Sequence, residues 1–298
     1  MGLIVLAIAL SIISPVFWSV GNITQIGVQS AVTAILAFGM TFVIVSAGID
    51  LSVGSMLALS AMVSAYVYTV GGVPSWLAAI IGLITGIFGG AINGIANAYF
   101  RLPSFIATLA MLSIARGLTL VISQGKPIAA APSVNVMGAS LGVIPAPILI
   151  FVLAGIVASF ILNRTAVGRA MYAVGGNIEA ARLSGIPVRR VQVSVFVLCG
   201  LYASIAGMVL AGRLNSAGAQ AGAGYELDAI AAVVIGGASL AGGAGKISGT
   251  VVGALLLAVI RNGLNIMNVP SFWQQVVIGA VIAVAVGIDA IKNKESAH

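Results

Sequence analysis

The sequence predicts an all-α protein: a polytopic transmembrane helical bundle of about ten helices that forms a single domain over residues 1–298. Of the 298 residues, 60% are hydrophobic and only 6% are charged, whereas soluble domains carry about 25% charged residues. The mean hydropathy of +1.19 indicates the same class. A membrane-spanning helix needs about 20 mostly apolar residues, so ten of them occupy roughly 200 and leave only short connections.

Apolar runs separated by turn residues and isolated charges mark the expected helices. The first run has no basic segment before it and no cleavage-site pattern ahead of Pro15, so we expect a membrane helix there and not a removed signal peptide. The eighth is short for a complete span, and we expect it to be broken or re-entrant. In chain order, the expected helices cover residues 2–18, 27–46, 52–70, 76–99, 104–122, 145–163, 191–211, 228–241, 247–266 and 272–290.

The distribution of Lys and Arg predicts the orientation of the helices, because cytoplasmic loops of membrane proteins carry an excess of basic residues. The segment 164–190 holds five arginines, so we expect it in the cytoplasm. Counting helices outward from this segment places nine basic residues on the cytoplasmic side, two outside, and both termini in the cytoplasm. Arg116 and Arg261 fall within helices, and the sequence does not identify their partners.

Two parts of the chain repeat the same features in the same order, which predicts an inverted repeat of helices 2–5 and 7–10. The fourth helix carries a glycine at every fourth position, and the ninth begins with the same spacing. Each glycine ridge is followed by Asn-Gly and then by Pro-Ser-Phe at the start of the next helix. An offset of five helices reverses the orientation of the second copy. The alternative is chance recurrence in a chain rich in Gly and Ala.

The glycine ridges are expected to be packing surfaces, because glycine lets a neighbouring backbone approach closely. We expect this packing inside one subunit, and a contact between subunits is the alternative. The helix-packing positions are Gly82, Gly86, Gly90, Gly94, Gly249 and Gly253.

The composition excludes several classes of chemistry. A single cysteine, Cys199, supports neither a disulfide framework nor a thiolate metal cluster, and the only histidine is the last residue, His298. The turns at Lys126 and Lys246 lack the Ser or Thr and the glycine spacing of a phosphate-binding loop. We therefore expect no catalytic, cofactor-binding or metal-binding residues. We attribute the net charge of +7 to the loops of a membrane protein and not to nucleic acid.

Acidic residues within apolar stretches are functional candidates, because a carboxylate is costly in lipid. Asp50 lies just before the third helix, followed by Ser52. We expect its carboxylate to cap that helix by accepting a hydrogen bond from the amide of Ser52 or Val53. A place in a transport pathway or gate is the alternative, and it is compatible with the cap. Glu226 and Asp228 precede the eighth helix, where the repeat predicts caps or the lining of an outer mouth, opposite the Asp50 region.

The segment 164–190 is long for a connection between helices, and long loops are often functional. Asn177 is suited to cap a short surface helix of about two turns, with Glu179 in its first turn. Gly185 closes this helix in the left-handed conformation, and Pro187 prevents its continuation. An ordinary interhelical loop is the alternative.

Three motifs resemble those of a known family. The short helix reads Glu179-Ala180-Ala181-x-x-x-Gly185, which resembles the coupling motif of bacterial ABC importer permeases, the segment that docks on their ATP-hydrolysing subunit. The stretches 39–55 (GMT…GIDLSVGS) and 224–243 (GYELDAIAAVVIGG…SLAGG) resemble the ribose-type sugar permease family. Together with the coupling motif, the resemblance extends over about residues 14–290.

This resemblance implies a membrane permease subunit that imports a ribose-like monosaccharide, with ATP hydrolysed by a separate subunit. It implies a multi-pass protein of the bacterial plasma membrane without a cofactor of its own. The implied partners are a second permease in a homodimer or paired permease, a cytoplasmic ATP-binding subunit, an extracytoplasmic sugar-binding protein and the lipid bilayer. Glu179, Ala180, Ala181 and Gly185 are implied to couple the permease to its ATPase, with the two small alanines seating the helix in a cleft of that partner.

Two other classes of function are alternatives to this interpretation. An ion-coupled secondary transporter of a small polar solute suits an inverted repeat and an intramembrane acid, but it has no need of the Glu-Ala-Ala-x-x-x-Gly helix. An intramembrane enzyme is poorly supported, because no acid–base or nucleophile–base pair stands out.

Overall fold

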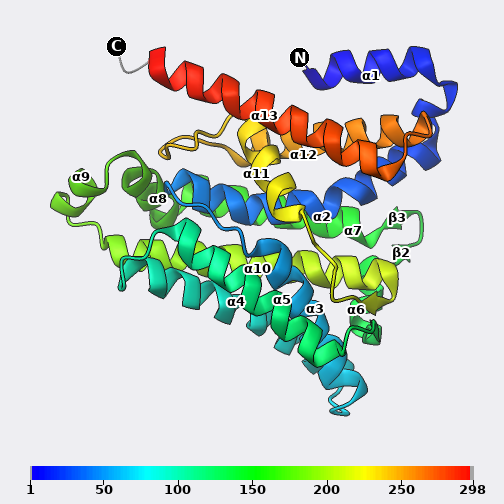
Figure 1. Cartoon of the computed structure of the whole chain (residues 1–298), viewed down its shortest axis with the longest axis horizontal. Helices are drawn as coiled ribbons and strands as arrows, with labels where there is room; N and C mark the ends of the chain where they lie inside the picture. Colours follow the sequence, from blue (N-terminus) through cyan, green and yellow to red (C-terminus); the bar gives the residue numbers. More distant parts are fainter. Residues whose placement is uncertain (1, 296–298) are drawn as a thin grey trace.

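The computed structural model describes residues 2–295, and the described chain is almost wholly helical. Met1 and residues 296–298, among them His298, lie outside the described residues. The long helices run along the long axis of the molecule, with α8 and α9 at one end and α6 at the other (Figure 1). We call these the α9 end and the α6 end.

The helices of the described chain are α1 (Gly2–Ile13), the 3-10 helix η1 (Pro15–Trp18), α2 (Val20–Val45), α3 (Val53–Thr69), α4 (Ser75–Ala98), α5 (Ser104–Ser123), α6 (Pro132–Gly138), α7 (Ala146–Arg164), α8 (Ala166–Gly176), α9 (Ile178–Leu183), α10 (Val188–Leu214), α11 (Tyr225–Ile235), α12 (Ile247–Ile266) and α13 (Ser271–Glu295). Four two-residue strands form two antiparallel pairs, β1 (Ile128–Ala129) with β4 (Ser216–Ala217) and β2 (Ser140–Leu141) with β3 (Ile144–Pro145).

The predicted fold class, an all-α membrane bundle, is confirmed. Within the described residues, six helices are long and apolar enough to cross a bilayer, namely α2, α4, α5, α7, α10 and α12. Helix α3 and the stretch Ser271–Val284 of α13 are shorter and also apolar. The connections carry little further structure, and most buried side chains belong to helices.

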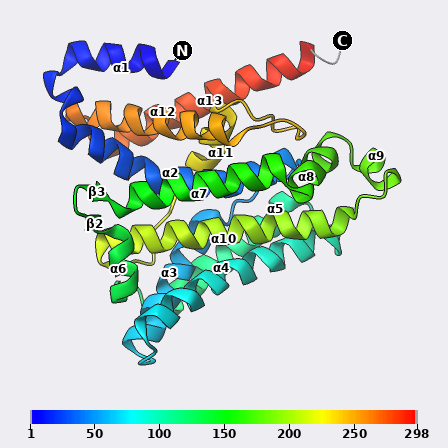
Figure 2. The same cartoon turned by 180° about the vertical axis from the view of Figure 1, so that it is seen from behind.

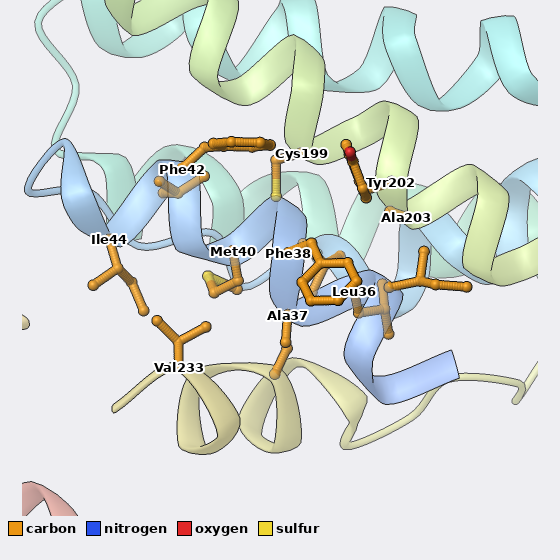
Figure 3. Packing of buried hydrophobic residues seen from close by; sticks show 14 of the residues in the cluster. Leu36, Ala37, Phe38, Met40, Phe42, Ile44, Cys199, Tyr202, Ala203 and Val233 are labelled. Atoms are coloured by element: carbon orange, nitrogen blue, oxygen red, sulfur yellow. The ribbon is translucent and has the colours of Figure 1, made fainter. Parts of the chain in front are cut away.

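Helix α2 forms the centre of the bundle. Its sequence is mostly apolar, with Gln25, Gln29 and Thr33 along one face, and it is covered by α7, α10, α11 and α12. Figure 3 shows α2 between Cys199 and Tyr202 of α10 on one side and Val233 of α11 on the other. The ring of Phe42 lies 5.8 Å from that of Tyr202, edge to face. Every residue from Ser30 to Val45 is buried, so the protein encloses this part of α2 on all sides.

The predicted repeat makes α2–α5 the counterparts of α10–α13. The contacts between helices agree with this pairing, because the first helix of each half packs on the second and third helices of the other half. Helix α10 packs against α3 and α4, and its counterpart α2 packs against α11 and α12 (Figures 1 and 2). Within each half, the short helix packs on the next long one, α3 on α4 and α11 on α12. The Asn-Gly positions differ, because Asn93 bonds to Ser52 at the start of α3 in its own half, whereas Asn262 bonds to Asn22 of α2 in the other half.

The glycine ridge of α4 lies against α10 within the same chain. A Cβ atom on Gly86 would overlap the carbonyl oxygen of Gly200, and one on Gly90 would overlap that of Phe196. Gly82 and Gly94 extend the same close contact, toward Met208 and Val193. Gly249 and Gly253 of α12 meet the backbone of α11 instead, at Gly236 and Ala232.

Several expected boundaries were wrong, each for a local reason. The first helix stops at Ile13, because Pro15 breaks it, and α2 begins at Val20 after the capping side chain of Ser19. The eighth helix was expected over 228–241 but covers Tyr225–Ile235. It ends where Gly237 adopts φ +89° and the Ala238 amide bonds back to Val233, a glycine-dependent helix stop. Helices α6 and α8 were not expected.

Candidate functional site

Helix α3 starts inside the bundle, after an extended segment. Helix α2 ends at the α9 end, and residues 46–52 run from there into the bundle before α3 begins (Figure 1). Two hydroxyls of α5 serve the backbone of this segment: Ser104 accepts from the Ile49 amide (3.2 Å) and Thr108 from the Leu51 amide (3.1 Å). Irregular backbone at membrane depth is tolerated where protein groups satisfy it, and α5 supplies them here.

Asp50 lies at the end of this segment and is only 2% exposed. Its Oδ1 accepts hydrogen bonds from the amide of Ser52 (2.8 Å) and from the Ser52 hydroxyl (2.6 Å). The side-chain amide of Asn93, on α4, donates to that same hydroxyl (2.9 Å). The expected bond from the Ser52 amide is confirmed, although Ser52 itself occupies the N-cap position of α3.

Helix α11 starts inside the bundle as well, after the glycine-rich loop 215–224 (Figure 1). Arg116 of α5 holds this loop, because its Nη1 donates to the carbonyl oxygens of Ala219 (2.5 Å) and Ala221 (2.9 Å). Arg116 therefore satisfies its charge on backbone oxygens, a partner that the sequence did not identify.

The two acids of α11 have different partners. The Oε1 atom of Glu226 accepts from the Gly224 amide (3.2 Å), so Glu226 bonds to the turn that leads into its own helix. Asp228 is 4% exposed, and its Oδ2 lies 2.6 Å from Nη2 of Arg261 on α12. The carboxylate of Asp228 thus pairs with a neighbouring helix, while the acids in the first turn also oppose the helix dipole.

The starts of α3 and α11 touch each other. A Cβ atom on Gly54 would overlap the carbonyl oxygen of Gly222 and the carboxylate of Glu226, so only glycine fits at this point. Gly222 has φ +70°, and its own hydrogen faces the carbonyl of Gly54. Two adjoining helix N-termini therefore bring together the residues that the sequence predicted for a pathway or gate, namely Asp50, Ser52, Glu226 and Asp228.

A polar cavity of about 210 Å³ adjoins Asp228 between α2, α10, α11 and α12. It is smaller than the roughly 300–1,000 Å³ of ordinary ligand pockets. Sequence reasoning missed most of its lining, and it placed Arg213 in a connection although Arg213 lies in the last turn of α10. The signal was present, because polar residues recur on one face of α2 at a spacing of about four. The polar lining residues are Gln29, Thr33, Arg213, Tyr225, Asp228, Arg261 and Asn265.

The second candidate site is the segment 164–190, which forms helices α8 and α9. Helix α8 begins after Thr165, whose Oγ1 accepts from an amide in the first turn (3.1 Å). Helix α9 begins after Asn177, whose side chain accepts from the Ala180 amide (2.9 Å). Glu179 lies in its first turn and forms an exposed ion pair with Arg182 (3.4 Å). The predicted capped helix is confirmed.

Gly185 ends α9 as the sequence predicted. Its φ is +79°, a left-handed conformation that residues with a Cβ adopt only at a cost. The Gly185 amide donates to the Arg182 carbonyl (3.0 Å), and the Ile186 amide donates to that of Ala181 (3.0 Å). No atom lies within 4 Å of a Cβ built on Gly185, so a substitution there acts on backbone conformation alone.

The exposed face of α9 differs from the one expected. Ala181 is 4% exposed and packs into the core of its own chain, so it does not face a partner. Ala180 is exposed, and so are the larger side chains of Ile178 (40%) and Leu183 (87%). The surface available for docking is therefore a small apolar face beside the Glu179–Arg182 pair.

Helix α8 is attached to the last turn of α2. The carbonyl oxygen of Val45 accepts from the Gly243 amide (2.9 Å), and a Cβ on Gly175 of α8 would overlap that same oxygen. The Tyr172 hydroxyl of α8 donates to the Gly245 carbonyl (2.7 Å). Burial raises the pKa of the Tyr172 phenol, which keeps the donor protonated. Helix α8 therefore contacts Val45, the last residue of α2 before the segment that leads to Asp50.

Comparison with known proteins shows the family. A family model described as "Branched-chain amino acid transport system / permease component" matches residues 22–286. The chain belongs to this family. The ribose import permease protein of Escherichia coli (strain K12) is 45% identical to this chain. The match covers 98% of this chain and 92% of the relative. The corresponding protein of Bacillus subtilis (strain 168) is 46% identical over the same shares.

A second kind of relative is less similar. The xylose transport system permease protein of Escherichia coli (strain K12) is 38% identical over 94% of this chain and 87% of its own length. No solved structure matches the chain. The permease is a multi-pass transport subunit of the ABC type and not an enzyme, because ATP is hydrolysed on a separate subunit. Such permease subunits carry no cofactor.

Proposed function

We propose that this permease moves a ribose-like monosaccharide into the bacterial cytoplasm. Relatives named as ribose import permeases share 45% and 46% of their aligned residues with it, against 38% for a xylose transport permease. The match to each extends over nearly the whole chain. A pentose or a related small sugar is therefore the substrate class that the comparison favours.

The observation that carries the mechanism is the connection from α9 to the interior of the bundle. Helix α9 projects at one end (Figure 2), and α8, which precedes it, contacts the carbonyl oxygen of Val45 at the end of α2. Residues 46–52 lead from Val45 to Asp50 and α3. Motion of α9 when the ATPase subunits close is thereby transmitted to the start of α3. Glu179, Ala180 and Gly185 couple the two proteins, and Ala181 anchors α9 to its own chain.

The contact between the starts of α3 and α11 is where the sugar path opens and closes. Asp50 and Ser52 surround one helix start, and Glu226 and Asp228 surround the other. Discontinuous helices that meet inside a bundle are the usual framework of substrate sites in transporters. Separation of the two starts would expose their polar groups to a sugar first from one side of the membrane and then from the other.

The rest of the assembly follows from the charge bias and the family. The α9 end and both termini face the cytoplasm, where the ATP-binding subunits dock. A sugar-binding protein docks on the α6 end, and two copies of the permease form a homodimer. Impermeant thiol labelling of a Ser184→Cys variant in a Cys199→Ala background tests the orientation. Labelling in intact cells would reverse it.

The decisive test is Gly185→Val, assayed in vesicles with the ATPase and the binding protein supplied. A β-branched residue at φ +79° changes the turn after α9, while membrane insertion is untouched. We expect normal permease abundance together with a parallel loss of ATPase copurification and sugar uptake. Gly185→Asn should retain most activity, because Asn tolerates the left-handed conformation. Ser140→Val, at the α6 end, is the matched control.

Two results would contradict the proposal. Full copurification and uptake by Gly185→Val would remove the coupling role of α9. Uptake driven by an imposed ion gradient without ATP would instead favour a secondary transporter.

A further inference from the structure

Two cavities adjoin each other on the outside of the bundle at the α9 end. The first, of about 650 Å³, lies between the end of α4, α9 and the start of α10. Four arginines line it: Arg101, Arg182, Arg189 and Arg190. The second, of about 920 Å³, lies between α4, α7 and α10, and its lining is mostly apolar. Tyr99 and Arg190 line both, so the basic cavity continues into the apolar one.

The positive charge of the first cavity is largely uncompensated. Arg182 pairs with Glu179 across 3.4 Å. Among the side chains that the structure describes, Arg101, Arg189 and Arg190 form no ion pair. The guanidinium of Arg189 lies 5.4 Å from the centre of the Tyr99 ring, a cation–π contact that orients it without neutralising it. Three positive charges therefore face one cavity with no protein anion between them.

The backbone adds to this field. The cavity contains the N-terminus of α10, where the helix dipole is positive. The first turn of α10 holds no acidic residue, although it holds Arg189 and Arg190, and the preceding Pro187 makes no side-chain capping bond. An anion at this position would satisfy both the arginines and the helix start.

The apolar cavity decides what kind of anion fits. Ile95, Ile161, Val193 and Val197 line a groove that opens between helices long enough to cross a bilayer. A free phosphate would leave this groove unused, and a neutral lipid would leave the arginines unmatched. Isolated arginines at helix ends usually extend separately to water, whereas these converge on one cavity that joins an apolar groove.

We propose that an anionic phospholipid occupies the two cavities. Its headgroup phosphate lies among Arg101, Arg189 and Arg190 at the start of α10, and an acyl chain lies along the groove between α4, α7 and α10. Basic pockets between membrane helices bind anionic lipid headgroups in this way. The lipid would then bridge the end of α4 and the start of α10, next to α9.

Native mass spectrometry of the full-length permease in detergent tests this assignment. The probes are phosphatidylglycerol and phosphatidylcholine with identical acyl chains, with inorganic phosphate as a separate arm. We expect phosphatidylglycerol to bind in preference to phosphatidylcholine. Arg101→Gln combined with Arg190→Gln should weaken phosphatidylglycerol binding by roughly fivefold for each arginine removed.

A second variant and a control separate the lipid from its alternatives. Val197→Trp fills the groove and should weaken phosphatidylglycerol binding while all three headgroup arginines remain. Arg169→Gln removes the same charge from α8, outside both cavities, and should leave binding unchanged. Equal binding of the two lipids, or equal loss in Arg169→Gln, would overturn the proposal in favour of diffuse surface charge.

Two other outcomes would also overturn it. If phosphate displaces phosphatidylglycerol completely and Val197→Trp has no effect, the site binds a free anion. If the double arginine variant keeps its lipid but loses copurification with the ATPase, a protein covers the cavity. Thermal unfolding of each variant shows that the fold is retained.

Discussion

The segments that lead into α3 and α11 both carry irregular backbone into the bundle, but neutral groups bind the first and charged groups bind the second. Before α3, Asp50 accepts from neutral donors, among them the amide and the hydroxyl of Ser52. At α11 the donors are charged arginines: Arg116 bonds to the loop before the helix, and Arg261 pairs with Asp228 in its first turn. Charge-assisted hydrogen bonds are roughly twice as strong as neutral ones. The α11 side is therefore the more firmly held of the two.

The difference also shows where the repeat stops being symmetric. Helix α5 serves both segments, through Ser104 and Thr108 on one and Arg116 on the other. Its counterpart α13 packs on α11 and α12. Helix α5 of the first half thus contacts both segments, and Arg261 of the second half adds a further contact at the start of α11.

The largest effect is expected from Asp228→Ala, which leaves the Arg261 guanidinium without its partner. Removing one member of a buried ion pair costs about 3–5 kcal/mol, and we expect the lower end, about 3 kcal/mol, because the Arg261 side chain is 32% exposed. The apparent melting temperature in detergent should fall clearly. The double variant Asp228→Asn with Arg261→Gln should recover much of the loss, and no recovery would show that the pair is not the cause.

Gly54→Ala should come next, because it forces the starts of α3 and α11 apart. The added methyl overlaps the Gly222 carbonyl and the Glu226 carboxylate, and overpacking of this kind costs about 2 kcal/mol. Sugar uptake should fall more than abundance does. Gly218→Ala is the matched control, since a Cβ there meets no atom within 4 Å. Equal uptake by the two variants would mean that the contact does not control the path.

Arg116→Gln should have a smaller effect, because it removes the two hydrogen bonds to the loop 215–224 but leaves the loop in place. Arg116 is only partly buried, so water replaces part of these bonds, and the total loss should be about 1.5 kcal/mol. We expect faster hydrogen–deuterium exchange in residues 218–224 and a modest decrease in melting temperature. Unchanged exchange in that loop would contradict the anchoring role, and Arg169→Gln on α8 serves as the comparison.

Asp50→Asn should have the smallest effect, because an amide oxygen can replace the carboxylate as acceptor for Ser52. We expect a loss of stability below about 1 kcal/mol and uptake close to that of the original protein. Asp50→Ala should cost more, since it leaves the Ser52 amide unpaired. If Asp50→Asn assembles normally and transports nothing, the charge of Asp50 is needed for gating, and the two helix starts are more alike than their partners suggest.

The features predicted well from the sequence are those set by local chemistry. The helix caps at Asn177 and Gly185 and the bond from the Ser52 amide to Asp50 involve residues close together in the chain. Apolar runs of membrane length are similarly local, and they located the long helices. The ion pair of Arg261 with Asp228 could also have been predicted, because the chain has only six acidic residues.

Features that depend on tertiary contacts were missed. Helix α8 has an ordinary cap at Thr165, but its position is set by the approach of Gly175 to the Val45 carbonyl, which no local pattern encodes. The burial of Ala181 depends on what lies behind α9. The overlong estimate for α11 had another cause, since its apolar composition continues past the turn at Gly237.

The enclosure of α2 has a consequence for biogenesis. Its main partners, α7, α10, α11 and α12, all follow it in the chain and are synthesised later. Helix α2 must therefore enter the bilayer surrounded by lipid and exchange that lipid for protein as the later helices arrive, as in a two-stage assembly. Its mostly apolar surface suits both surroundings. A nascent chain released before α10 is complete would leave the centre of the bundle in contact with lipid, a state that quality-control proteases of the membrane can recognise.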